Sequence, residues 1–268
     1  MTDASPPATL KPPVRSATER GLDMLVWGGV LLLLILAFHP VQMDNIGRLV
    51  SNSGNIREFS KDLVRPDFSR WQLYVAQMWL TVQIALWGTF LAVLIAVPLG
   101  LLCARNITPI WIQQPVRRIN DLLRSIPDLV IGILFITAVG LGPLPGVLAL
   151  SVNTGSVLAK LFSEAVESID PRPVEGVRAT GAHRLQEIVW GVLPQVGPLW
   201  TGYALYRFES NARSATVLGL IGAGGIGQTL FDSINGFQYR ETSAIVIVIV
   251  AAVTLIDLLS QAMRTRLL

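Results

Sequence analysis

The chain has 268 residues, of which 51% are hydrophobic and 15% charged, and its mean hydropathy is +0.54. Soluble domains carry about 25% charged residues, so this composition lacks the polar surface of a water-soluble globule, and the lipid bilayer is the natural solvent. The net charge of +3 is a weak signal for nucleic acid, because the basic residues lie at the ends of apolar runs. Two histidines and one cysteine provide no ligand cluster for a metal ion.

The first part of the chain predicts a tail followed by a membrane span. Residues 1–20 are rich in proline, serine and threonine, which indicates a disordered cytoplasmic tail. The apolar run Leu22–Phe38 lacks a small-residue cleavage site, so we expect a retained span and not a cleaved signal. We expect residues 21–70 to hold this helix and an extracytoplasmic loop, and residues 71–268 to form the core.

The next apolar runs predict three further spans. Trp71–Ala104 is free of charges and exceeds the roughly 20 residues that a crossing helix needs. Leu129–Ala159 is also free of charges, but glycine and proline turn signals at 140–145 divide it. We therefore expect a third span that starts near Leu122 and a fourth that runs from Leu144 into the region of Lys160.

Two more runs complete an all-α, polytopic membrane protein of about six transmembrane helices. Ile188–Tyr206 begins the fifth span, and Thr242–Ile256 forms the core of the sixth. Lys and Arg concentrate on one side of the membrane if both termini are cytoplasmic, which agrees with the positive-inside rule. This orientation assigns the segment with Arg105, Arg117 and Arg124 to the cytoplasm, together with the loop 169–195.

The cytoplasmic loop 169–195 has the pattern of a helical hairpin. Pro171 stops the incoming helix and permits a new one, whose first turn would contain Glu175, where the helix dipole favours a carboxylate. Gly181 permits a sharp bend. A second short helix, Leu185–Leu193, would follow and end at Pro194.

A small, lightly apolar hairpin suits a cleft in a partner protein. The alternative is an ordinary loop between spans, which usually has no such ordered pattern, and spacing alone does not decide between the two. We expect partner contacts from the following residues: Glu175, Gly176, Val177, Arg178, Ala179, Gly181, Ala182, Leu193 and Pro194.

The segment Gly222–Gly227 matches G-x-G-x-x-G, a motif of dinucleotide sites. That interpretation requires a preceding strand, a following helix and a suitably placed acidic residue, whereas this segment lies between two spans. We expect these glycines to permit tight helix packing or an irregular backbone near the outer mouth of the pore. The sequence also has no P-loop motif, so we expect no ATP site on this chain.

The fifth span carries charges, each of which costs about 2.5–3.5 kcal/mol at membrane depth unless it pairs or faces water. Glu209 and Arg213 are four residues apart and can pair, whereas Arg207 has no obvious partner. If Arg207 is unpaired, its positive charge would make a transport path electropositive and suited to an oxyanion. The alternative is that these groups hold neighbouring helices together. The candidate path residues are Arg207, Glu209, Asn211, Arg213 and Ser214.

Glu175, Gly181 and Leu193-Pro194 together resemble the EAA loop of membrane subunits of binding-protein-dependent ABC importers. Further blocks resemble the phosphonate importer permeases: Arg124-Ser-Ile-Pro-Asp128, Gly140-Leu-Gly-Pro143, Glu175-Gly-Val-Arg-Ala-Thr-Gly181, and Ser214 to Gly227. The resemblance extends from Trp71 to the carboxyl terminus. The sequence departs from the general pattern at Gly176-Val177, where two alanines are usual, and at Gly191, where an apolar residue is usual.

The resemblance implies a type I ABC importer permease in the bacterial plasma (inner) membrane. It implies a homodimeric pore, two cytoplasmic ATPase subunits that bind ATP and Mg, and an extracytoplasmic phosphonate-binding protein. This chain would bind no cofactor or nucleic acid and have no catalytic residue. Its expected function is inward transport of phosphonates by alternating access.

Two alternatives remain open at this point. The first is a permease for phosphite, phosphate or another small anion. The second, from a different class, is an ion-coupled secondary transporter, which usually has buried acidic residues and two repeated halves. We find no internal repeat in the sequence.

Overall fold

The computed structural model describes residues 17–47 and 53–267, and it contains no strand within these ranges. The helices are α1 Ala17–Phe38, η1 Met43–Ile46, α3 Ser53–Leu63, α4 Trp71–Cys103, α5 Ile110–Ser125, α6 Asp128–Val139, α7 Pro143–Glu167, α8 Pro171–Ala179, α9 Arg184–Glu187, η2 Ile188–Val192, α10 Leu193–Gly219, α11 Ile226–Asn235 and α12 Tyr239–Leu267. Residues 1–16 of the predicted tail lie outside the described residues, and α1 already begins at Ala17, within the region expected to be a tail.

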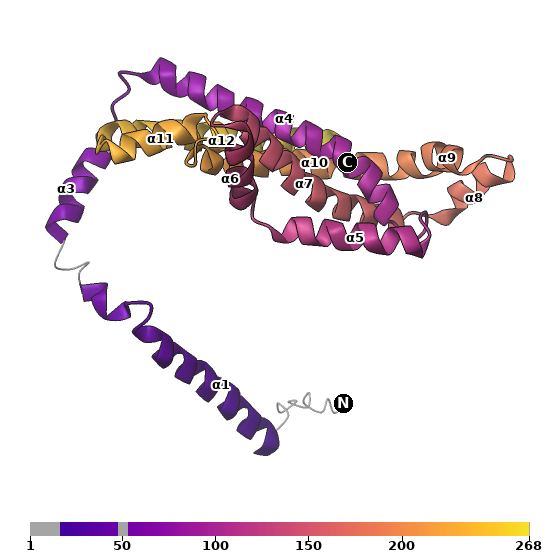
Figure 1. Cartoon of the computed structure of the whole chain (residues 1–268), viewed down its shortest axis with the longest axis horizontal. Helices are drawn as coiled ribbons and strands as arrows, with labels where there is room; N and C mark the ends of the chain where they lie inside the picture. The colour runs from indigo at the N-terminus through magenta and orange to yellow at the C-terminus, as the bar shows by residue number, and fades with distance from the viewer. Residues whose placement is uncertain (1–16, 48–52, 268) are drawn as a thin grey trace, which may run out of the picture. The chain divides into compact units, whose positions relative to one another are not determined.

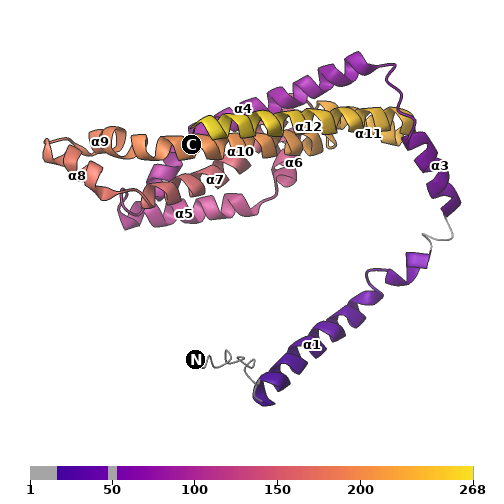
Figure 2. The ribbon, with the colours of Figure 1, turned by 180° about the vertical axis from the view of Figure 1, so that it is seen from behind.

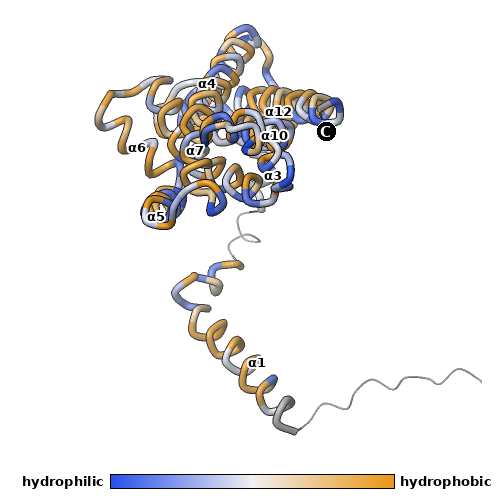
Figure 3. The backbone as a smooth tube through the Cα atoms, turned by 90° about the vertical axis from the view of Figure 1, so that its right-hand side faces the viewer, coloured by the Kyte–Doolittle hydropathy of each residue, from blue (hydrophilic) through white to orange (hydrophobic). Residues whose placement is uncertain are grey.

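The chain divides into two compact units, residues 1–60 and 61–268. In the first unit, Gly21–Phe38 of α1 is long and apolar enough to cross a membrane, and none of it is buried. Its tube has mostly hydrophobic colour in Figure 3. The length and composition of this helix agree with the predicted first span.

In the second unit, the long helices α4, α7, α10 and α12 lie side by side (Figures 1 and 2). Small residues bring α4 close to α7: a Cβ atom at Gly88 would lie 2.8 Å from Cβ of Leu150, and one at Gly100 would lie 2.7 Å from Cβ of Phe162. Phe162 also stacks on Trp200 of α10, with ring centroids 4.4 Å apart. Close packing through small residues is typical of helices in membranes.

Four described helices, namely α1, α4, α7 and α12, are long and apolar enough to cross a membrane, and the bent pair α5–α6 would make a fifth. The helix α10 has 27 residues, which is sufficient length, but it contains the charged cluster. The expected number of about six spans is reached when both the bent pair and α10 are counted.

The predicted third span is not one straight helix that starts near Leu122. The chain instead forms α5 and α6, which meet at an angle of 89°. The 12 residues of α6 rise about 18 Å, which is too short for a hydrocarbon core of about 30 Å. The cause is Pro127, because a residue before proline avoids the helical region, and Ile126 is extended at φ −85° and ψ 123°.

The helix α5, which contains Arg117 and Arg124, packs against α4 and α7. The helix runs antiparallel to the carboxyl-terminal half of α7 (Figures 1 and 2), and Asn120 Nδ2 donates to the Ser156 carbonyl at 2.8 Å. At its start, Gln113 Nε2 donates to the Cys103 carbonyl of α4 at 3.2 Å. Arg117 and Arg124 therefore belong to a helix packed on the core.

Candidate functional site

The docking hairpin, which we define as residues 170–195, projects from one end of α7 and α10 (Figures 1 and 2). Its first helix, α8, begins at Pro171 and is capped by Asp170, whose carboxylate accepts the Arg172 N–H at 3.0 Å. This hydrogen bond and the side chain of Arg172 lower the pKa of Asp170. Glu175 lies one turn further on, so its predicted place in the first turn is wrong. The carboxylate at the helix start belongs to Asp170.

The bend at Gly181 is confirmed. Its φ angle is +84°, a conformation that favours glycine, and its N–H donates to the Arg178 carbonyl at 3.0 Å. A capping box then starts α9: Gln186 Oε1 accepts the His183 N–H at 3.0 Å, and His183 Nδ1 accepts the Gln186 N–H at 3.4 Å. The two arms of the hairpin therefore have defined ends.

The second arm does not stop at Pro194, and that prediction is wrong. It continues from α9 through the π-helical turn η2 into α10, with Pro194 in the first turn of α10. The Leu193 N–H donates to the Ile188 carbonyl, five residues back. A widened turn of this kind accommodates a proline ring without breaking the helix. The second arm of the hairpin and the long helix α10 are consequently one continuous element.

An ion pair joins the two arms of the hairpin. The Arg178 guanidinium donates to both carboxylate oxygens of Glu187, each at 2.9 Å. This bidentate contact lowers the pKa of Glu187 and raises that of Arg178. Sequence reasoning missed the pair, and the available signal was the presence of opposite charges on either side of the Gly181 bend.

The arms also pack closely at Gly191. A Cβ atom at this position would lie 3.0 Å from Cα of Val174, so a larger residue would push α8 away from η2. At the base, Gln195 Oε1 accepts the Asp170 N–H at 3.2 Å, and its Nε2 donates to the Gly191 carbonyl at 2.6 Å. The departure from the general pattern at Gly191 therefore has a packing reason.

The hairpin leaves most of the predicted contact residues accessible. The exposed ones are Glu175, Gly176, Arg178, Ala179, Gly181 and Pro194, and the half-buried ones are Val177, Ala182 and Leu193. A cavity of about 440 Å³ lies beneath the hairpin and is lined in part by Glu167, Val174 and Glu175. This surface is free for a partner.

The candidate path residues all lie on α10, where charged groups form a network with α12. Glu209 accepts from Arg213 and Arg264, each at 3.2 Å, and Arg213 also contacts Asp257 at 3.2 Å. The predicted Glu209–Arg213 pair is confirmed. Sequence spacing could not show Asp257 and Arg264, because they lie on another helix.

Asn211 and Arg207 belong to a group of polar side chains between the helices. Asn211 is buried, its Nδ2 donates to Thr89 Oγ1 at 2.9 Å, and its Oδ1 accepts from Thr154 Oγ1 at 2.8 Å. These bonds join α4, α7 and α10. Arg207 Nη2 contacts the same Thr154 hydroxyl at 3.4 Å, while its Nε is buried without a partner in the described residues. Arg207 therefore keeps a donor for an acceptor that these residues do not supply. Ser214 is half-buried on the same helix.

The glycine-rich segment serves helix packing, as predicted. A Cβ atom at Gly227 would lie 1.8 Å from the Thr216 carbonyl oxygen, so α11 can approach α10 only with glycine there. Gly225 has φ +75°, and a Cβ atom there would collide with Thr81, whose Oγ1 accepts the Ile226 N–H at 2.8 Å. These contacts explain the glycines of the G-x-G-x-x-G pattern by helix packing, without a bound nucleotide.

The apolar spans and the projecting hairpin define a multi-pass membrane permease subunit. Residues 96–267 match the family described as the inner membrane component of binding-protein-dependent transport systems, and the chain belongs to this family. It is therefore a permease subunit of an ABC importer and a multi-pass inner-membrane protein, and the resemblance found in the sequence is confirmed.

Similar proteins agree with this membership. The chain is 39% identical over 247 residues to the phosphite transport system permease protein PtxC of Stutzerimonas stutzeri, covering 92% of this chain and 88% of that protein. It is 61% identical over 117 residues to a protein of Escherichia coli K12 provisionally named cryptic phosphonate transport system permease protein PhnE2, covering 44% and 96%. A chain of the inward-facing MetNI methionine ABC transporter superposes with a TM-score of 0.66 over 75% of this chain and 99% of that chain. Its identity is 21%, so it shows the fold alone.

Proposed function

We propose that this chain is the membrane subunit of an ATP-driven importer for phosphonates, which moves the anion inward by alternating access. The observation that carries the proposal is Arg207, whose buried Nε donor has no partner within the described residues and lies beside Thr154. Guanidinium groups bind phosphorus oxyanions through paired hydrogen bonds. The similarity to permeases named for phosphite and phosphonate supports the same class of cargo.

A second cargo, phosphite or phosphate, is supported by the phosphite permease that matches most of the chain. These anions share their oxygen acceptors with phosphonates, so Arg207 would serve any of them. A secondary transporter receives less support. Glu209 pairs with both Arg213 and Arg264, and the sequence shows no internal repeat of the kind that secondary transporters usually have.

The docking hairpin would supply the energy for transport through a partner. In this proposal a cytoplasmic ATPase binds its exposed residues, holds ATP and Mg, and moves the hairpin when its two copies close. A second copy of this chain would complete the pore, and an extracytoplasmic protein would deliver the anion. Both chain termini would then lie in the cytoplasm, with residues 21–70 forming the first helix and outer loop, and residues 71–268 the core.

Growth on defined phosphorus sources tests the cargo. A strain lacking this gene should fail to grow on a phosphonate as sole phosphorus source, and the wild-type gene should restore growth. If the deletion strain fails to grow on phosphite but grows normally on phosphonates, the second cargo is the correct one. Unchanged growth on phosphonates, phosphite and low phosphate would contradict the proposal, provided that no second importer is present in the strain.

A further inference from the structure

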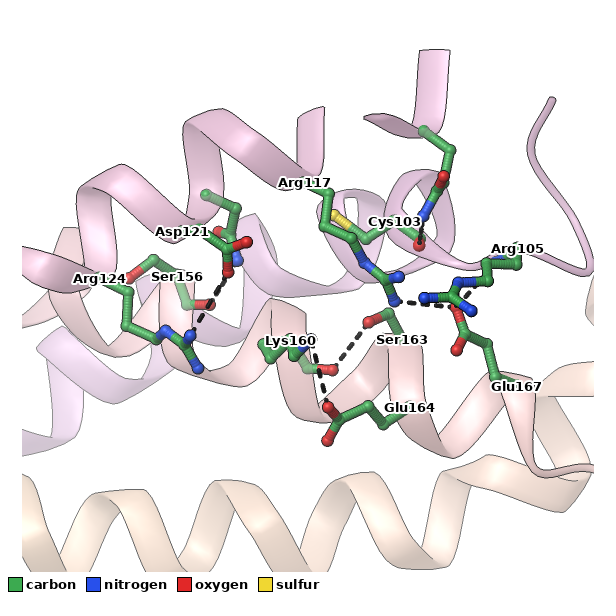
Figure 4. Close-up of polar contacts among 12 residues, drawn as sticks. Cys103, Arg105, Arg117, Asp121, Arg124, Ser156, Lys160, Ser163, Glu164 and Glu167 are labelled. Atoms are coloured by element: carbon green, nitrogen blue, oxygen red, sulfur yellow. Dashed lines mark hydrogen bonds and ion pairs between the residues drawn. The ribbon is translucent and has the colours of Figure 1, made fainter. Parts of the chain in front are cut away.

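Glu167, the last residue of α7, connects three segments of the chain (Figure 4). Its Oε1 accepts a hydrogen bond from Arg117 Nη2 of α5 at 2.9 Å and another from the backbone N–H of Arg105 at 3.0 Å. Arg105 Nε also lies 3.9 Å from the same oxygen. One carboxylate therefore ties the end of α7 to α5 and to the loop that follows α4.

Arg117 depends on this carboxylate. Its side chain is 11% exposed, and its Nε is buried without a partner among the described residues. A buried guanidinium that loses its carboxylate is left with an uncompensated charge, which is strongly unfavourable. The pair should therefore stay closed while α5 and α7 move.

The neighbouring ion pairs do not make such a connection. Arg124 pairs with Asp121 at 3.4 Å within α5, and Lys160 pairs with Glu164 at 3.4 Å within α7 (Figure 4). Across residues 17–47 and 53–267, Arg117–Glu167 is the one ion pair that joins α5 to another helix. A pair between helices can transmit force, whereas a pair within one helix cannot.

Glu167 also lies directly beside the docking hairpin. Residues 168–170 separate it from α8, and its side chain lines the cavity beneath the hairpin together with Val174 and Glu175. Asp170 is held in turn by Gln195 of α10. A displacement of the hairpin would reach Glu167 through the short backbone segment that follows it.

We propose that Glu167 is a positioning residue that transmits movement of the docking hairpin to α5 through Arg117. The bend of 89° after α5 would pass this movement to α6. The inference rests on the proposed docking of an ATPase at the hairpin, and it names the residue that links this docking to the membrane helices.

Transport by the complete complex in proteoliposomes tests the proposal. Glu167→Gln should leave complex assembly intact and keep ATP hydrolysis within about twofold of wild type, while the uptake per ATP hydrolysed falls about tenfold, because a lost link reduces the coupling between sites. Glu164→Gln is the matched control on the same helix and should change uptake per ATP little. Exchanging the charges in Arg117→Glu/Glu167→Arg should restore much of the coupling.

Two results would overturn the proposal. One is an uptake per ATP in Glu167→Gln equal to that of wild type. The other is a parallel fall of assembly, hydrolysis and uptake, which would indicate a role in folding alone.

A distance measurement separates this inference from the proposed cargo. If the wild-type complex takes up none of the tested anions, the proposed function fails, and spin labels at Gln114→Cys on α5 and Leu185→Cys on α9 still test the link. We expect one narrow distance distribution with and without ATP, which Glu167→Gln broadens. A distribution unaffected by Glu167→Gln would contradict the role of this residue.

Discussion

Gly227 shows how one missing side chain sets the distance between two helices. Its replacement by alanine would place Cβ 1.8 Å from a backbone oxygen of α10, so the helices must separate. We expect Gly227→Ala to destabilise the folded chain by about 3 kcal/mol, the upper part of the range for overpacked cores. The measurement is the thermal unfolding midpoint in detergent.

Gly197 provides the matched control, because a Cβ atom there would have no atom within 4 Å. Gly197→Ala should leave the midpoint unchanged or raise it slightly, since alanine favours a helix by about 1 kcal/mol over glycine. Equal destabilisation by both substitutions would contradict the packing account.

The Arg178–Glu187 pair predicts a pH dependence of the hairpin. Because folding lowers the pKa of Glu187, the pair stabilises the hairpin above the ordinary carboxyl value of 4.5 and loses this effect as the pH falls through the lowered pKa. Glu187→Gln should therefore increase hydrogen exchange of residues 176–188 at pH 7. The difference from wild type should vanish well below pH 4.5.

Glu175→Gln is a suitable control for this measurement, since Glu175 is exposed on the same hairpin and forms no ion pair within the described residues. Exchange that rises equally in both variants would contradict the role of the pair.

At the scale of elements, we expect that changing the bend at Gly181 impairs transport but not membrane insertion. A bulky residue at φ +84° strains the backbone and should displace the two arms of the hairpin. Gly181→Trp should insert into the membrane normally, yet uptake should fall about tenfold or more, because docking and transport become uncoupled. Uptake by vesicles, normalised to the amount of inserted protein, checks this expectation. Normal uptake would contradict the docking account.

The elements also show what the sequence can and cannot predict. Long apolar runs located α1, α4 and α7, because length and composition suffice for a helix in lipid. The bend in the third span was not predicted, because Pro127 was not used to divide it, and apolar composition does not give the direction of the chain after a break. The docking hairpin was located by Gly181, but its continuous second arm depends on a π-helical turn that no local pattern signals.

At the scale of the whole molecule, the site depends on contacts between distant segments. Asn211 was recognised as a polar residue in a span, but its bonds to Thr89 and Thr154 join three helices and follow from tertiary packing. Glu167 was not recognised, because its partners are 50 and 62 residues away in sequence. The local sequence pattern therefore located the hairpin, whereas contacts between distant segments determine how the hairpin is attached to the spans.

Alternating access requires the hairpin to move with the helices it joins. The continuity of η2 with α10, the Gln195 contacts and the Arg117–Glu167 pair give three connections for this movement. Rigid displacement of packed helices around an interface is an established form of conformational change. The central claim is that the exposed side of the docking hairpin receives the ATPase.

Cysteine crosslinking in the native membrane tests this claim most directly. Ala179→Cys lies on the exposed face of the hairpin, and Leu141→Cys lies at the opposite end of α7 as a matched exposed control, while the natural Cys103 is buried. We predict that a short bifunctional reagent joins a cytoplasmic ABC ATPase subunit to the chain through position 179 and not through position 141. Absence of a crosslink at 179, or equal crosslinking at both positions, would contradict the account.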